Sequence, residues 1–278
     1  MQQVSKNVFV ETEFSGCNVG FVETAEGIVM VDTPSFPSDS VKWGKAVRSR
    51  GMIKYLINTE VHIDHVFGNF FFPEATVVGH DGIRKRFPVT AEDFSRAVAL
   101  TKQQDPEGLE LIRDYVPRPP VKTYTGKLDL KVGAHSFLLI NLPGHSPEQT
   151  AVLMPEERVV FTGDNVVNHN NLWIQEADPW EWLEALDKIA DLEADVIVPG
   201  HGPVCDRNRV PQMASLIHEW VQAVQGAMDR GIGRDEAIQT ISFLDRYPVQ
   251  PAERARYTNT QKLNVANIWD RLVARRAT

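Results

Sequence analysis

The stretch Lys54-Tyr55-Leu56-Ile57-Asn58-Thr59-Glu60-Val61-His62-Ile63-Asp64-His65 joins an apolar run to a cluster of metal-ligand side chains. We expect residues 54–58 to form a buried strand, because the run is short, apolar and followed by polar residues. Glu60, His62, Asp64 and His65 then fall within six positions. A strand end followed by a tight loop can aim alternate side chains at one point. The stretch therefore predicts a candidate metal site at the end of a strand.

Three more side chains of this kind stand where other strands are expected to end. The segments are Leu142-Pro143-Gly144-His145, Phe161-Thr162-Gly163-Asp164 and Val198-Pro199-Gly200-His201. A glycine before each ligand-type residue lets the backbone turn sharply, so the three side chains can converge on residues 60–65. Convergent histidine and carboxylate groups are what borderline divalent metals require. We therefore expect His145, Asp164 and His201 to join the same centre.

Strand-like and helical segments alternate around these motifs. We expect strands at residues 8–13, 18–23, 28–31, 75–78, 127–132, 135–141, 150–154, 159–161 and 196–198. Helices are expected at 38–50, after His65 and at 180–192. This order predicts two sheets with helices outside them, a four-layer αββα sandwich of the α/β (α+β) class.

Two segments lie outside this pattern. Residues 81–120 predict a helical insertion, with Thr90 at a helix start and Pro117, Pro119 and Pro120 closing it. Residues 208–278 carry apolar side chains at helical spacing and predict a helical extension that serves as packing surface rather than chemistry. We expect a single domain, 1–278, with these two additions.

Composition limits the classes of partner. With 278 residues and 42% hydrophobic content the chain can bury one substantial core. A formal net charge of −8 gives no basic stripe, so nucleic acid is not an expected partner. Cys17 and Cys205 show no CxxC spacing, which leaves a disulfide framework unsupported. The polar N-terminus and the lack of a long apolar run predict a cytoplasmic protein with no membrane partner.

At these motifs the chain resembles the metallo-β-lactamase superfamily, whose usual signature is HxHxDH followed by separate His, Asp and His ligands. The resemblance covers roughly residues 7 to 205, in the right order. It implies two divalent metal ions, most simply zinc. Position by position, it implies His62 and His145 in site 1, Asp64, His65 and His201 in site 2, Asp164 as the bridging carboxylate and Asp32 as a structural residue beside the site.

Glu60 departs from the family signature, because it stands in place of the first histidine. We predict that Glu60 is a ligand of site 1. Carboxylate is a harder donor than imidazole, so site 1 would accept iron or manganese more readily. The alternative is that Glu60 hydrogen-bonds a ligand histidine or a metal-bound water.

The resemblance implies a hydrolase in which a hydroxide shared by the metals attacks an ester, lactone, thioester or amide-type substrate. Asp164 would orient the hydroxide, and Asp64 would hold site 2 and relay a proton. One alternative is an iron-dependent oxidoreductase of the same superfamily, acting in dioxygen or persulfide chemistry. The other is a non-catalytic metal-binding module whose C-terminal helices form a homodimer surface.

Residues 165–173 follow the expected bridging aspartate and are predicted to lie at the mouth of the site. Asn168, His169 and Asn171 are candidate substrate contacts, although amides also solvate loops. Arg84-Lys85-Arg86 would meet an anionic substrate if the insertion formed a lid. A short charged run is more often a solvated face.

Overall fold

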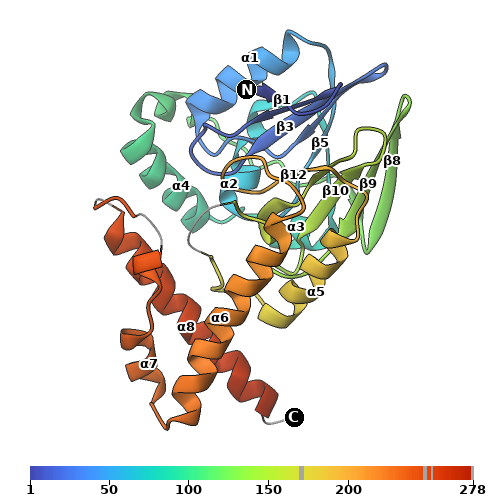
Figure 1. Cartoon of the computed structure of the whole chain (residues 1–278). Helices are drawn as coiled ribbons and strands as arrows, with labels where there is room; N and C mark the ends of the chain where they lie inside the picture. Colours follow the sequence, from blue (N-terminus) through green and yellow to red (C-terminus); the bar gives the residue numbers. More distant parts are fainter. Residues whose placement is uncertain (169–171, 247–248, 252, 277–278) are drawn as a thin grey trace.

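Two mixed β-sheets form the centre of the molecule (Figure 1). The structure is a computed structural model that describes residues 1–168, 172–246, 249–251 and 253–276. Within these residues the first sheet has seven strands, in the spatial order β1 (Gln2–Gln3), β2 (Val8–Glu11), β3 (Val19–Thr24), β4 (Gly27–Val31), β5 (Ile53–Ile57), β6 (Thr76–His80) and β7 (Lys122–Tyr124). The second has five, in the order β12 (Val196–Val198), β11 (Val159–Phe161), β10 (Thr150–Met154), β9 (His135–Asn141) and β8 (Lys127–Val132).

Each sheet contains an antiparallel part and a parallel part. Strands β1 to β4 are antiparallel, and β4 to β7 are parallel. In the second sheet β8 to β11 are antiparallel, and β11 pairs with β12 in parallel. The carboxyl ends of neighbouring parallel strands lie at one edge of a sheet, and this edge is where the expected ligands stand.

The alternation of side chains along the strands creates three apolar layers. On β10, Val152 packs between the sheets, while Ala151 and Leu153 face the opposite way. On β4, Val29 lies between the sheets and Met30 on the outer face. Successive strand residues point to opposite faces, so two buried faces per sheet give the four-layer αββα arrangement.

Helices cover the outer face of each sheet (Figure 1). Helix α1 (Pro37–Arg48) places Trp43 on the first sheet, where its ring centroid lies 5.5 Å from that of Phe21. Helix α5 (Pro179–Ala190) buries Trp182 and Leu186 against the second sheet. The expected α/β (α+β) sandwich is therefore confirmed.

The segment between β6 and β7 is helical, as the sequence predicted. It contains α3 (Asp81–Arg86), α4 (Ala91–Gln104) and the 3-10 helix η2 (Pro106–Ile112). Thr90 caps α4, because its hydroxyl accepts from the backbone N–H of Asp93 and the Asp93 carboxylate accepts from the backbone N–H of Thr90. This capping box explains why the helix begins at this position.

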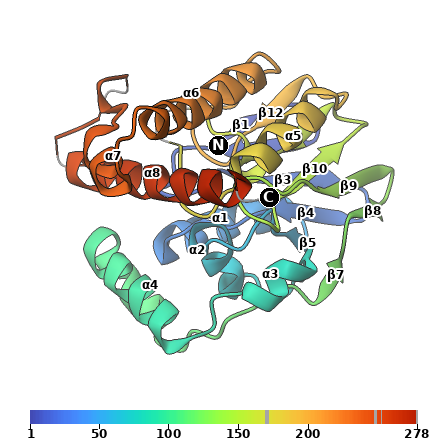
Figure 2. The same ribbon diagram turned by 90° about the horizontal axis from the view of Figure 1, so that it is seen from below.

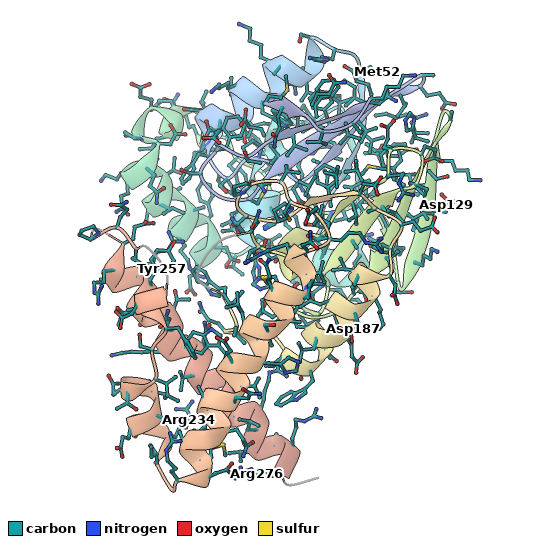
Figure 3. The ribbon with its side chains drawn as sticks, in the orientation of Figure 1. Met52, Asp129, Asp187, Arg234, Tyr257 and Arg276 are labelled. Atoms are coloured by element: carbon teal, nitrogen blue, oxygen red, sulfur yellow. The ribbon has the colours of Figure 1, made fainter. Side chains whose placement is uncertain are left out.

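The C-terminal part contains α6 (Arg209–Asp229), α7 (Arg234–Thr240), η4 (Leu244–Arg246) and α8 (Arg254–Arg276). Figure 2 shows α8 beside α6, with α7 at one end. Trp220 of α6 and Ile268 of α8 are buried in the same apolar layer as α5. In Figure 3 Arg234 and Arg276 lie at the end of these helices far from Asp129 of β8. In the part of the chain that the structure describes, no helix combines the length and apolarity that a membrane span needs.

One expected boundary is wrong in a way that affects the site. The sequence predicted a helix after His65, but α2 (Ile63–Val66) begins before it, with His62 as its N-cap, and continues into η1 (Phe67–Phe71). Asp64 and His65 therefore project from a helical turn rather than from alternating positions of a loop. The helical conformation is favoured because it buries the side chains of Val66 and Phe67.

Candidate metal centre

The strand ends bring four separate segments to one edge of the sandwich. Glu60 follows β5, Asp164 lies in η3 (Gly163–Asn165) directly after β11, and His201 follows β12. His145 follows β9, which runs in the same direction as β11 because both are antiparallel to β10. The sheets meet here through a hydrogen bond from the Thr150 amide to the Thr59 carbonyl, 2.8 Å long.

Glu60, His62 and His145 form the first group of potential ligands. One ligand atom from each lies within 4.8 Å of the others. His145 Nε2 is 3.2 Å from His62 Nδ1, and the Glu60 carboxylate contacts the same His62 nitrogen. Glu60 is fully buried, whereas the His62 side chain is 34% exposed. This is the set that the sequence predicted for site 1.

Asp64, His65 and His201 form the second group, again with ligand atoms within 4.8 Å of one another. His201 Nε2 is 3.4 Å from Asp64 Oδ2. Asp164 lies between the groups, with its oxygens 3.3 Å from His65 Nε2, 3.2 Å from His201 Nε2 and 3.6 Å from His145 Nε2. All seven residues predicted as ligands therefore lie in one place, with Asp164 between the two groups.

Unpartnered buried atoms show that these residues fit a metal centre. Both carboxylate oxygens of Glu60, His65 Nε2 and Asp164 Oδ1 are buried and make no hydrogen bond of regular geometry within the described residues, although they lie against one another and against His62. Such atoms are costly to bury without a partner. Two divalent cations held by imidazole nitrogens and carboxylate oxygens would satisfy them.

The outer ring nitrogens of two histidines are held by groups that face away from the centre. His65 Nδ1 donates to Asp32 Oδ2 at 3.0 Å, and the Asp32 carboxylate also accepts from the Thr59 amide at 2.8 Å. His201 Nδ1 donates to the Gly16 carbonyl at 2.8 Å. Each bond fixes the ring with Nε2 toward the centre, so that Nε2 is the nitrogen that a metal would bind in exchange for its proton. Asp32 occupies the structural position that the resemblance implied.

His62 is held by a residue that the sequence did not reveal. His62 Nε2 donates to Glu176 Oε1 at 2.8 Å, which leaves Nδ1 facing Glu60. Arg86 of α3 donates to Glu176 Oε2 and to the buried Glu148 Oε2, each at 2.7 Å. The Arg84-Lys85-Arg86 run is thus not entirely solvent-facing, because Arg86 forms ion pairs with Glu176 and Glu148 at the rim of the site. Glu176 lies in no motif, so no local signal identified it.

The charges of the cluster shift its pKa values in opposite directions. Burial alone would lower the pKa of His201, but the Asp164 carboxylate raises it to about 10. The pKa of His62 is also raised, because the charge of Glu60 and the Glu176 hydrogen bond outweigh burial. Burial lowers the pKa of His145. Burial opposes ionisation of Asp164, yet His201 and His65 hold its pKa below the usual range. The carboxylates of the cluster are therefore neutralised by protonated histidines. Divalent cations can replace these protons and stabilise the same carboxylates.

Gly163 and Gly200 are needed beside the centre for two different structural reasons. Gly163 has φ +49°, a left-handed conformation that the turn before Asp164 requires. Gly200 has no such φ; a Cβ there would collide with Asp164 Oδ1. The expectation of sharp turns thus holds at Gly163, whereas Gly200 is required for close approach.

The predicted substrate contacts are only partly within the described residues. The side chain of Asn168 donates to the Pro203 carbonyl at 2.8 Å, so its amide is used in the loop. His169 and Asn171 lie outside the described residues. Cys17 lies beside the centre and donates to the Asp64 carbonyl. Burial raises the pKa of the Cys17 thiol to about 12, so the free thiol stays protonated at neutral pH.

Comparison with known proteins places this centre in a family. The family model of the metallo-beta-lactamase superfamily matches residues 12–201, which include every residue of the centre. The chain belongs to the metallo-β-lactamase superfamily, and the resemblance stated from the sequence is confirmed.

Relatives within the superfamily differ in activity. The chain is 23% identical over 287 residues to the linear primary-alkylsulfatase of Pseudomonas sp., covering 89% of this chain and 54% of the relative. It is 26% identical to the beta-lactamase-like protein 2 homolog of Caenorhabditis elegans, covering 69% and 58%. Against the atrochrysone carboxyl ACP thioesterase of Aspergillus fumigatus it is 28% identical, covering 47% and 37%. The chain spans about half the length of the first two relatives and less of the third.

Solved structures show the same fold. A metallo-beta-lactamase family protein of Thermus thermophilus superposes with a TM-score of 0.68 at 19% identity, covering 96% of this chain and 94% of that one. A stereoselective inverting sec-alkylsulfatase from Pseudomonas sp. superposes with a TM-score of 0.70 at 15% identity, covering 97% and 49%. These likenesses support the fold alone.

Proposed function

We propose that the chain is a metal-dependent hydrolase that cleaves a small-molecule ester, lactone, thioester or amide-type substrate at a dinuclear zinc centre. The observation that carries the proposal is the convergence of seven ligand-type side chains, four of which have buried polar atoms that make no regular hydrogen bond, among them both oxygens of Glu60. A structural site would leave no ligand side chain open to a substrate. Here His62, Asp64 and His201 are each about one third exposed.

Some residues of the centre would hold the metals in place, and others face the solvent. Two divalent cations would supply a nucleophile from water at neutral pH and draw electrons from the substrate carbonyl. Asp164, with its side chain 10% exposed, lies between the two groups and would fix their spacing. Asp64, with its side chain 32% exposed, contacts His201 Nε2 and faces solvent, so it is placed to pass a proton outward.

A second candidate is an iron-dependent oxidoreductase acting in dioxygen or persulfide chemistry. One observation favours it, the fully buried Glu60 beside His62 and His145. Three carboxylates at one centre make it harder than an imidazole-rich centre and more acceptable to iron or manganese.

A metal-resolved activity screen tests the proposal. We would strip the chain with chelator, reload it with zinc, manganese or ferrous iron, and assay p-nitrophenyl esters, a lactone, a thioester, a primary alkyl sulfate and nitrocefin. The proposal expects hydrolysis of an acyl substrate that returns with zinc and falls at least a hundredfold in Asp164→Asn. Consumption of dioxygen or a persulfide by the iron form, with no hydrolysis under any metal, would establish the second candidate instead.

A further inference from the structure

A cavity of about 310 Å³ lies between the start of α4 and α2, the helical turn that contains Asp64 and His65. Aromatic rings form much of its wall. The Tyr115 ring stacks on Phe67 at 4.5 Å and on Phe94 at 5.4 Å between ring centroids. Because stacked rings are rigid, the wall is preformed rather than assembled around a ligand.

The rim of this cavity exposes apolar side chains that packing does not explain. Val89 is 60% exposed and Phe94 is 36% exposed, and both line the cavity. Apolar side chains gathered at the mouth of a pocket are typical of a ligand site, whereas scattered ones are not informative. Val89 and Phe94 are therefore placed to be covered by a ligand.

The polar residues in the wall are already paired with each other. Thr90 Oγ1 donates to Asp93 Oδ2 at 2.6 Å, and the backbone N–H of each residue donates to the side chain of the other. Hydrogen bonds from Thr90 hold the pKa of Asp93 below its usual range, so the carboxylate stays charged at the cavity edge. The capping box therefore offers little to a polar ligand and repels an anionic one.

Two stretches of chain connect the cavity to site 1. Ile63 lines the cavity and stands in the sequence between His62 and Asp64. Pro88 also lines it, two residues after Arg86, which pairs with Glu176, the partner of His62. The cavity therefore shares the helical turn of α2 with Asp64 and His65, two of the candidate ligands.

We propose that this cavity binds an apolar acyl or aromatic group of the substrate while the scissile bond lies at the metal centre. The proposal rests on the hydrolase function and names its substrate class. An apolar cavity of about 150 Å³ accommodates benzene, so this one holds a bicyclic ring or a chain of roughly six to ten carbons. Short acyl groups would leave it empty and gain nothing from it.

A chain-length series tests the subsite on the zinc-loaded full chain. With p-nitrophenyl esters from acetate to decanoate, kcat/KM is expected to rise about threefold per methylene until the cavity is filled. Ala91 lines the cavity and is exposed, so Ala91→Trp fills it without disturbing the core. Leu100→Trp is the matched control, since Leu100 is exposed on the same helix but does not line the cavity. Ala91→Trp should flatten the series and Leu100→Trp should not.

A binding measurement tests the subsite independently of the hydrolysis reaction. The neutral fluorophore N-phenyl-1-naphthylamine should bind the metal-stripped chain and the Leu100→Trp variant equally, and bind Ala91→Trp at least tenfold more weakly. Hydrolysis with no chain-length dependence, or equal slopes in both variants, would overturn the subsite and leave the hydrolase proposal intact. If no ester is cleaved, selective loss of fluorophore binding in Ala91→Trp still supports an apolar site, and unchanged binding refutes it.

Discussion

At the scale of single residues, Glu60 is the substitution that sets this centre apart from the family signature. A carboxylate replaces an imidazole, so the centre contains three carboxylates instead of two. Two divalent cations would bring four positive charges, and Glu60 would lower the remaining charge by one. A less positive centre should acidify water less and should bind harder metals more readily.

We expect Glu60→Ala to lose one of two bound divalent ions, or to bind it at least tenfold more weakly, because both Glu60 oxygens are buried and make no regular hydrogen bond. Glu60→His is the control, since it restores the usual donor and should keep both ions with a stronger preference for zinc. Metal content after dialysis measures both variants. Two ions retained in Glu60→Ala would mean that Glu60 is only a hydrogen-bonding neighbour of the ligands.

At the scale of elements, helix α8 has a role beyond packing surface. Its polar side chains Asn264, Asn267 and Arg271 recur at helical spacing and hold residues 172–178, the loop that carries Glu176. Asn264 donates to the Leu172 carbonyl at 2.6 Å, and Asn267 donates to the Ile174 and Ala177 carbonyls at 2.6 and 2.9 Å. The C-terminal extension thus reaches site 1 through the loop it holds.

Arg271 provides the test of this connection, because it donates to the Glu176 carbonyl at 3.0 Å and to Asp178 Oδ2 at 2.7 Å. Arg271→Met should weaken divalent-metal binding at site 1 by about threefold to tenfold, less than the 10–100-fold typical when the direct partner of a ligand is removed. Competition with a chromogenic chelator measures the affinity.

The matched control for this helix is Arg276→Met, which removes an exposed ion pair with Asp229 at the far end of α8 (Figure 3). Exposed pairs contribute little, so its metal affinity should equal that of the parent chain. Equal affinities in both variants would show that α8 does not position Glu176.

At the scale of the whole molecule, Glu157 joins the two sheets at the start of β11, the end of this strand opposite Asp164. It lies in the turn between β10 and β11 and accepts from Ser5 Oγ at 2.7 Å and from Asn7 Nδ2 at 2.5 Å, both in the segment before β2. It also accepts from His135 Nε2 of β9 at 2.9 Å. Burial opposes ionisation, yet these hydrogen bonds lower the pKa of Glu157 to about 2.

The lowered pKa predicts a pH-dependent contribution to stability. Because the folded pKa lies below the ordinary 4.5, the contribution is fully present above about pH 4.5 and is lost as the pH falls toward 2. Glu157→Gln should lower the free energy of unfolding by about 1–3 kcal/mol at pH 7, with the difference vanishing over that window. Urea unfolding measures it. Glu156→Gln, an exposed neighbour, should change stability by less than about 0.5 kcal/mol; an equal loss in both would contradict the assignment.

The sequence alone indicated the layers, the seven candidate ligands and the strands other than β1 and β7, because each is marked locally. Apolar runs of strand length predict β8, β9, β10, β11 and β12 with the residue bounds found, and ligand-type residues follow strand ends directly. Hydrophobic periodicity and turn residues act over a few neighbouring positions, so one chain suffices to recognise them.

Only the tertiary structure decided what surrounds the ligands. Glu176 meets His62 across 114 positions of the chain, and Arg271 reaches Glu176 across 95 more. The cavity likewise needs Ile63, Phe94 and Tyr115 from three separate segments. Contacts of this kind arise from packing between layers, and neither residue type nor local spacing records which distant side chain will fill the space.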